Sequence, residues 1–234
     1  MERKSFNLLR ALSDPQDLDL FVQLQLLDGM SDPGVRSELA AWTRSERDPN
    51  QKARLAAIVG RQWRYGELLP LVEELLADAS DSVVAAVLER FSVGRNEVEK
   101  DPEFVRRASS LMIAAAGSNR SESVRVNALR GIRRVDARPT RFLMDLISRD
   151  RNDRVVAAAI TALPAGYRLD GEPGLAVEMI RLLYSIATDA SRAPRVRFSA
   201  ALAADSNDLF DEEKILTPDE QEVVEKIQSE LRDK

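Results

Sequence analysis

The hydrophobic and polar positions follow a helical period along the whole chain. Apolar residues recur at intervals of three and four, and no segment alternates with the period of two that a strand requires. The pattern predicts helices at about 2–12, 15–29, 33–46, 49–62, 66–78, 81–92, 102–117, 121–135, 139–149, 152–163, 173–190, 193–204 and 217–232. Most connections between them are short, so consecutive helices are expected to run antiparallel. The sequence therefore predicts an all-α protein.

Proline residues mark the places where these helices are expected to begin. Proline suits the first helical position, because its missing N–H would be unpaired there in any case. The prolines at predicted starts are Pro15, Pro33, Pro49, Pro102, Pro139, Pro173, Pro194 and Pro218, and four of them follow a capping aspartate: Asp14, Asp32, Asp48 and Asp101. Thr217 and Glu220 are expected to form a capping box. Pro70 is expected to tilt or kink its helix, and Pro164 to follow a helix end.

A loose repeat runs through the same segments. Asp32–Ala41 aligns with Asp48–Ala57, and later segments share a valine followed by small and aliphatic residues. The anchor positions 51, 83, 124, 155 and 196 are 32, 41, 31 and 41 residues apart. Such a spacing is the length of two helices and two turns, and helical pairs of this kind bury their apolar faces by stacking on one another.

Three of the segments resemble the opening of the second helix in HEAT repeats, with armadillo repeats as the near alternative. They contain Val35-Arg36, Val124-Arg125 and Val196-Arg197, and the resemblance covers about residues 30–205. It implies a right-handed α-α superhelix, a HEAT-like solenoid of about six helical pairs over residues 1–204, with residues 1–29 as the N-terminal cap. It also implies that Arg36, Arg125 and Arg197 pair with an acidic residue of a neighbouring repeat.

The end of the chain is expected to differ from the repeats. Residues 205–234 are predicted to form an acidic linker and a C-terminal capping helix. This helix has an apolar stripe of Val223, Val224, Ile227 and Leu231, which indicates that it covers another surface.

The resemblance also predicts which surface binds a partner, because the second helix of each pair commonly lines the concave face. Helical wheels place small, apolar and basic residues there. The predicted binding residues are Arg130, Arg133, Arg134, Arg154, Ala157, Thr161 and Arg195. Such a face would suit a helix or a peptide, although small residues there are also explained by close helix packing. Phe198 and Leu202 face the same way, and their expected cover is the chain's own tail (Leu209, Phe210, Ile215 or the last helix) or a partner.

The charge distribution is uneven. Residues 1–104 have a net charge of −6, residues 105–198 of +8, and residues 205–234 of −7. A basic middle between acidic ends is explained either by salt bridges within repeats or by a patch for an anionic partner.

Composition excludes several kinds of chemistry. The chain has no cysteine and no histidine, which excludes disulfides, thiolate nucleophiles and imidazole catalysis. No phosphate-binding glycine loop or EF-hand spacing is present. We expect no cofactor, no metal and no enzymatic activity, and the acidic cluster at 205–213 is expected to be a solvated linker. With no signal peptide and no apolar run of membrane-spanning length, the expected location is the cytoplasm.

The expected function is that of a non-enzymatic protein–protein interaction scaffold or adaptor. The alternative is a DNA- or RNA-binding protein that uses the arginine-rich middle repeats. A distant form of this alternative is a repair protein, because the chain distantly resembles the HEAT-like alkylpurine DNA glycosylases, which combine a basic concave face with an aspartate and tryptophans. Here only the basic face has a counterpart, since Trp42 and Trp63 lie outside the arginine-rich segment.

Overall fold

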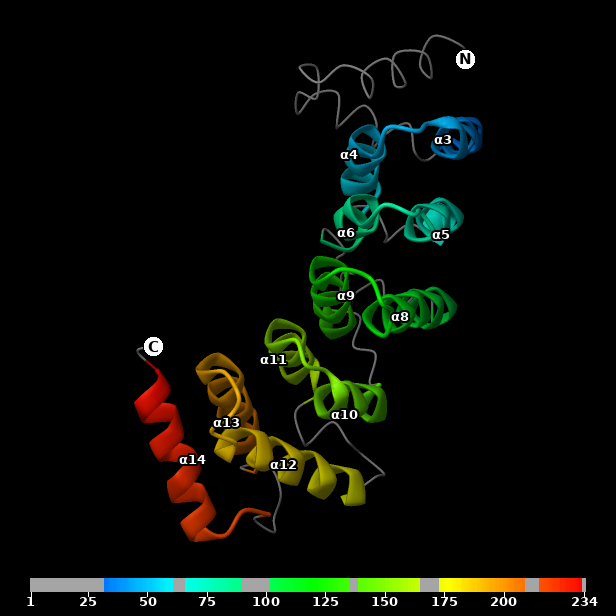
Figure 1. Ribbon diagram of the computed structural model, residues 1–234. Helices are drawn as coiled ribbons and strands as arrows, with labels where there is room; N and C mark the ends of the chain where they lie inside the picture. Colours follow the sequence, from blue (N-terminus) through cyan, green and yellow to red (C-terminus); the bar gives the residue numbers. More distant parts are fainter. Residues whose placement is uncertain are drawn as a thin grey trace. The chain divides into compact units, whose positions relative to one another are not determined.

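The computed structural model describes residues 32–60, 66–89, 102–134, 139–164, 173–208 and 215–232. Within these ranges every regular element is a helix (Figure 1). The helices are α3 (Pro33–Ser45), α4 (Pro49–Gly60), the short 3₁₀ helix η1 (Gly66–Leu68), α5 (Leu69–Leu76), α6 (Asp81–Glu89), α8 (Pro102–Ala116), α9 (Glu122–Arg134), α10 (Thr140–Arg149), α11 (Asp153–Ala162), α12 (Pro173–Thr188), α13 (Pro194–Asp208) and α14 (Pro218–Leu231). The all-α prediction is confirmed.

The chain divides into two compact units, Met1–Ala137 and Arg138–Lys234. In the first unit, the first helices of successive pairs (α3, α5 and α8) lie in one row and the second helices (α4, α6 and α9) in another (Figure 1). Leucine, isoleucine and methionine side chains fill the space between the rows, among them Leu39, Leu55, Leu75, Leu88, Met112, Leu129 and Ile132. This stacking of helical pairs is solenoid-like.

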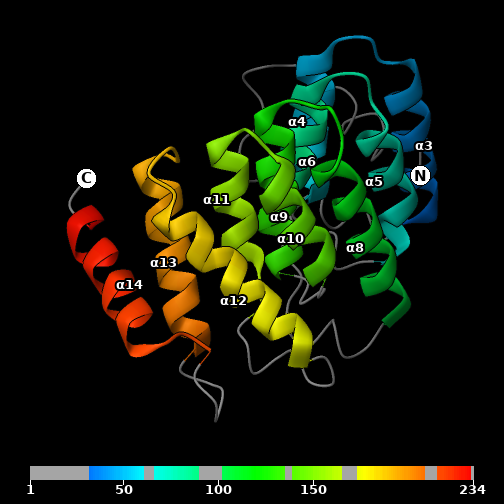
Figure 2. The same cartoon turned by 60° about the horizontal axis from the view of Figure 1, so that its bottom comes forward.

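The second unit is built in the same way. Its first helices α10 and α12 pack together, as do its second helices α11 and α13, and α14 packs on α13 and on part of α12. Figure 2 shows α11, α13 and α14 side by side. The buried residues of this unit include Leu143, Ile147, Val155, Met179, Leu183, Val196 and Val224.

Local sequence signals account for most helix starts. The Asp32 carboxylate accepts a hydrogen bond of 2.8 Å from the N–H of Gly34 at the start of α3. Asp48 does the same for Asn50 at the start of α4. The predicted capping box is present at α14, where Thr217 accepts from the N–H of Glu220 and Glu220 accepts from the N–H of Thr217. These caps satisfy N–H groups that have no partner inside the helix.

Three local predictions are wrong. Pro139 precedes α10 as its N-cap instead of opening it. Pro70 lies in the first turn of α5, after η1, so it causes no kink within a longer helix. Helix α13 continues to Asp208, four residues beyond its predicted end, because Ala204 is buried and Asp205 is bonded to α14.

Other sequence predictions lie outside the described residues. They are the helices predicted within 2–29, the N-terminal cap they would form, and the contacts of Trp63, Leu209 and Phe210. The described ranges contain five helical pairs followed by α14. Among these helices, none has the length and hydropathy needed to cross a bilayer.

Candidate binding surface

The predicted binding residues of the first unit lie on α9. Arg130 and Arg133 are both exposed to solvent. The Arg130 guanidinium donates to the side-chain oxygen of Asn127 at 3.4 Å, and Asn127 in turn donates to the carbonyl oxygen of Ala85 on α6 at 3.2 Å. Arg133 has no carboxylate partner among the described residues. Arg134 ends α9, and its side chain lies outside the described part.

The remaining predicted binding residues belong to the second unit. Arg154 and Arg195 are exposed and each is the second residue of its helix, α11 and α13 respectively. Thr161 is exposed, and its hydroxyl donates to the carbonyl oxygen of Ala157 at 2.8 Å. Among the described residues, Arg195 has no carboxylate partner. The predicted residues thus form two groups, one in each unit.

The prediction for Ala157 is wrong. The helical wheel placed it on the outward side of α11, whereas in the structure it is only 8% exposed. A wheel treats one helix by itself, but α11 packs against both α10 and α13. Packing against neighbouring helices therefore covers a position that a single-helix pattern leaves open.

Phe198 and Leu202 lie on the same face of α13, separated by one helical turn. Phe198 is half-buried, and Leu202 is 48% exposed. Helix α14, one of the expected covers, packs elsewhere on α13. Gln228 donates to the carbonyl oxygen of Ala201 at 3.3 Å, and Gln221 donates to the Asp205 carboxylate at 2.6 Å.

Helix α14 packs on its own chain through most of the predicted stripe. Val224, Ile227 and Leu231 are buried, whereas Val223 is 38% exposed. An ion pair of 2.6 Å between Arg181 on α12 and Glu220 holds the start of the helix. The terminal helix therefore completes the second unit and leaves Leu202 uncovered.

The three repeated arginines stabilise the helical pairs. Arg36 forms an ion pair with Glu67 of the next pair at 2.6 Å, as expected. Arg125 and Arg197 instead donate from Nε to the carbonyl oxygens of Ala116 and Ala187, at 3.2 and 2.9 Å. Both carbonyls end the first helix of the same pair, where they have no partner within that helix. Arg125 and Arg197 thus join the two helices of one pair. Arg36 instead joins neighbouring pairs, and it lies on α3, a first helix, so the prediction that Val35-Arg36 opens a second helix is wrong.

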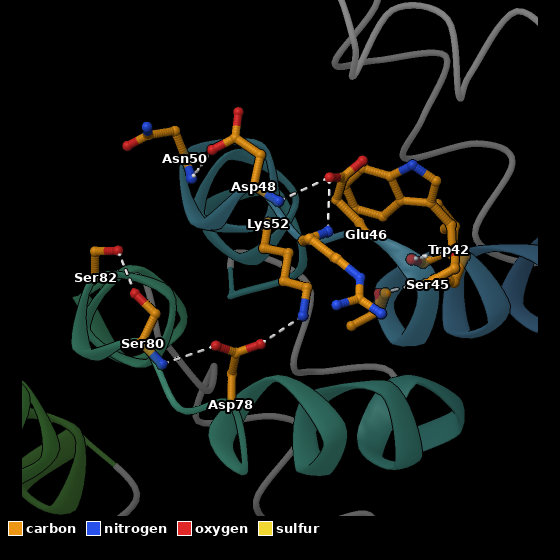
Figure 3. A network of polar contacts seen from close by, with 12 residues as sticks. Trp42, Ser45, Glu46, Asp48, Asn50, Lys52, Asp78, Ser80 and Ser82 are labelled. Carbon is orange, nitrogen blue, oxygen red and sulfur yellow. Dashed lines mark hydrogen bonds and ion pairs between the residues drawn. The ribbon is translucent and has the colours of Figure 1, made fainter.

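The turns between paired helices contain a polar network that the sequence did not predict. Lys52 on α4 and the N–H of Ser80 both donate to the Asp78 carboxylate at 2.8 Å (Figure 3). Arg120 of the following turn donates to the carbonyl oxygen of Asp78 at 2.7 Å and pairs with Asp81 at 3.0 Å. In this way the turn that contains Asp78 is bonded to α4 on one side and to the following turn on the other.

The network also acts on the acidity of its carboxylates. Burial raises the pKa of Asp78, but the hydrogen bonds from Lys52 and Ser80 outweigh it and leave the pKa below its usual range. The N–H and hydroxyl of Ser121, with Arg120, hold the pKa of Asp81 below its usual range. Both carboxylates are therefore ionised at neutral pH and structural in role.

These turns could have been predicted from the sequence, because their aspartate and arginine recur at a fixed spacing that is longer than one helical pair. Asp150 and Arg192 stand 72 positions after Asp78 and Arg120, and Arg192 donates to the carbonyl oxygen of Asp150 at 3.4 Å. Asp150 also accepts from the N–H of Asn152 at 2.8 Å, as Asp78 does from Ser80. The two units thus share a turn that recurs after two helical pairs.

Within the described ranges no group of carboxylates is arranged to hold a metal ion. Asp205, from the acidic cluster at 205–213, accepts from the amides of Gln221 and Gln228.

No protein-family model, curated protein or solved structure matches the chain.

Proposed function

We propose that this chain is a HEAT-like repeat adaptor, a non-enzymatic scaffold that binds a protein partner on the outward face of its second helices. The cytoplasmic location expected from the sequence belongs to this proposal. The observation that carries it is Leu202, a large apolar side chain that is 48% exposed and lies on the same face of α13 as the exposed Arg195, two turns away. Exposed apolar residues bordered by charged ones are typical of protein interaction sites.

The repeated geometry supports a HEAT-like arrangement. Val83, Val124, Val155 and Val196 occupy equivalent positions in their helices and are all fully buried. Arg125 and Arg197 make the same bond to the end of the preceding helix in two different units. A repeat that preserves both the buried anchor and the arginine contact gives regularly spaced second helices, which is the property a scaffold uses.

A site-specific photo-crosslinker tests this function. We would place it at Thr161 on α11 or at Arg133 on α9, and at Ser148 on α10 as the control, since Ser148 is exposed on a first helix. The expected result is a protein adduct at Thr161 or Arg133 in native host cells and none at Ser148. An absence of protein adducts at both second-helix positions, or equal adducts at Ser148, contradicts the proposal.

Nucleic-acid binding is the second candidate. The net charge of +8 over residues 105–198 and the exposed Arg130, Arg133 and Arg195 favour it. The test is fluorescence anisotropy with a duplex of about 20 base pairs between about 50 and 300 mM salt, where phosphate contacts give a steep loss of affinity. Arg130→Glu with Arg133→Glu would weaken such binding without altering the melting temperature. No binding at low salt excludes this candidate, and with it the distant glycosylase-like activity, whose direct test is release of a free base from alkylated DNA.

A further inference from the structure

Helix α13 presents one strip of chemically distinct residues. Arg195, Phe198 and Leu202 follow one another at intervals of three and four, so they lie on one face of the helix. The large apolar residues most exposed in the described ranges are Val177, Leu202 and Val223, each on a different helix. Of these, Leu202 alone lies on a second helix, with an aromatic ring and an arginine on the same face. We call Arg195, Phe198 and Leu202 the α13 strip.

The neighbouring helix α11 has smaller side chains than the α13 strip at equivalent positions. Val155 and Val196 are both fully buried and are each the third residue of their helix, so the two helices can be aligned on them. In that register Ala157 corresponds to Phe198, and Thr161 to Leu202. Because Ala157 is buried, Thr161 is the exposed residue of this pair of positions on α11, and its short side chain lets another helix approach while Phe198 and Leu202 provide apolar contacts.

The charged and the apolar residues of this surface lie at different ends of the helices. Arg154 and Arg195 occupy the first turns of α11 and α13, where the helix N-termini add partial positive charge. The apolar Leu202 lies two turns further along α13. Because the first turn of α13 contains no acidic residue, the α13 strip is positive at its N-terminal end and apolar toward the other, which suits a ligand with carboxylates and an apolar stripe.

The same unit already holds a helix of this kind on the adjacent side of α13. Helix α14 contains Asp219, Glu220, Glu222, Glu225 and Glu230 and packs through Val224, Ile227 and Leu231. Its packing leaves the α13 strip exposed. The unit therefore holds an acidic amphipathic helix against α13, and the α13 strip lies outside the printed contacts of that helix.

We propose that the α13 strip, together with Thr161 on α11, binds an acidic amphipathic helix of a partner protein. The apolar stripe of that helix packs on Phe198 and Leu202, and one of its carboxylates pairs with Arg195. This inference rests on the proposed adaptor function and specifies the chemistry of the partner.

The test uses the full chain and a fluorescent designed peptide of about 18 residues, an amphipathic helix of Glu, Ala and Leu. A scrambled peptide of the same composition and a helix with Lys in place of Glu are the control ligands. We expect micromolar binding of the acidic helix, weakened about tenfold by Leu202→Ser and by Arg195→Glu. The matched control variants, Val223→Ser and Arg149→Glu, should bind within about twofold of the unmodified chain.

Circular dichroism melting of each variant checks that the exposed substitutions leave the fold intact. Equal binding of the scrambled or basic peptide, no binding of the acidic helix, or unchanged affinity of the Leu202 and Arg195 variants overturns the inference. A protein adduct at Thr161 or Arg133 would then still support the adaptor function. The two proposals therefore fail on different measurements.

Discussion

Arg120 donates a hydrogen bond of 2.7 Å to the carbonyl oxygen of Asp78, although the two residues are 42 positions apart. The same guanidinium pairs with Asp81. Arg120 lies in the turn of one helical pair and bonds the turn of the preceding pair, so it joins two repeats at their edge. Arg192 and Asp150 make the corresponding contact in the second unit.

Replacement of Arg120 by alanine is expected to destabilise the first unit by about 1–2 kcal/mol, because two partners in the adjacent turn lose a half-buried donor. The measurement is urea unfolding of the full chain. Arg106→Ala is the control, since Arg106 pairs only within its own helix and is highly exposed, and its effect should stay below about 0.5 kcal/mol. Equal losses for both variants would contradict a role between repeats.

Gly60 permits the close approach of α4 to α6. A Cβ at this position would overlap the carbonyl oxygen of Val87. Glycine to alanine inside a helix usually adds about 1 kcal/mol of stability, but here we expect a loss of about 1–3 kcal/mol from overpacking. A Cβ at Gly174 in α12 would meet nothing within 4 Å, so Gly174→Ala should be neutral or slightly stabilising. Thermal unfolding of the two variants checks this, and a stabilised Gly60→Ala chain would refute it.

Asp81 is expected to make the first unit sensitive to acid. Hydrogen bonds from Ser121 and Arg120 lower its pKa in the folded state, so its stabilising effect is present above the pKa of an unfolded aspartate. That effect is lost as the pH falls through the lowered folded value. Asp81→Asn should therefore be less stable than the unmodified chain at pH 7, and the difference should shrink as the pH falls below about 4. Urea unfolding at a series of pH values measures it.

Asp145→Asn is the control for the acid experiment. Asp145 is an exposed residue paired with Arg149 on its own helix, and its replacement should have little effect at any pH. A difference between Asp81→Asn and the unmodified chain that does not change with pH would show that the ionised carboxylate is not the stabilising group.

Two adjacent valines on α14 are expected to contribute very differently to the free energy with which this helix docks. Val224 is fully buried against the rest of the second unit, whereas Val223 is partly exposed. Val224→Ala is expected to weaken α14 docking by about 2 kcal/mol, and Val223→Ala to change it by less than about 0.5 kcal/mol. Hydrogen exchange of the α14 amides reports this docking directly. Similar exchange in both variants would mean that α14 is not held by its apolar stripe.

Local signals were sufficient to predict most of the helices. Asp32 before Pro33, Asp48 before Pro49 and the Thr217 capping box each act over three or four residues, so their outcome is independent of the rest of the fold. The exposure of Arg130 and Thr161 followed from the helical period for the same reason.

Contacts between residues distant in sequence decided what the local patterns could not. Helix α13 extends to Asp208 because α14 packs beside it and bonds Asp205, and Ala157 is buried because α11 packs against neighbouring helices. The bond from Arg120 to Asp78 depends on the stacking of two pairs. Most helix starts depend on hydrogen bonds within one turn of the chain, and the sequence by itself determined those. Helix ends, burial and the exposed strip on α13 depend on which neighbour packs where, and only the tertiary structure decided them.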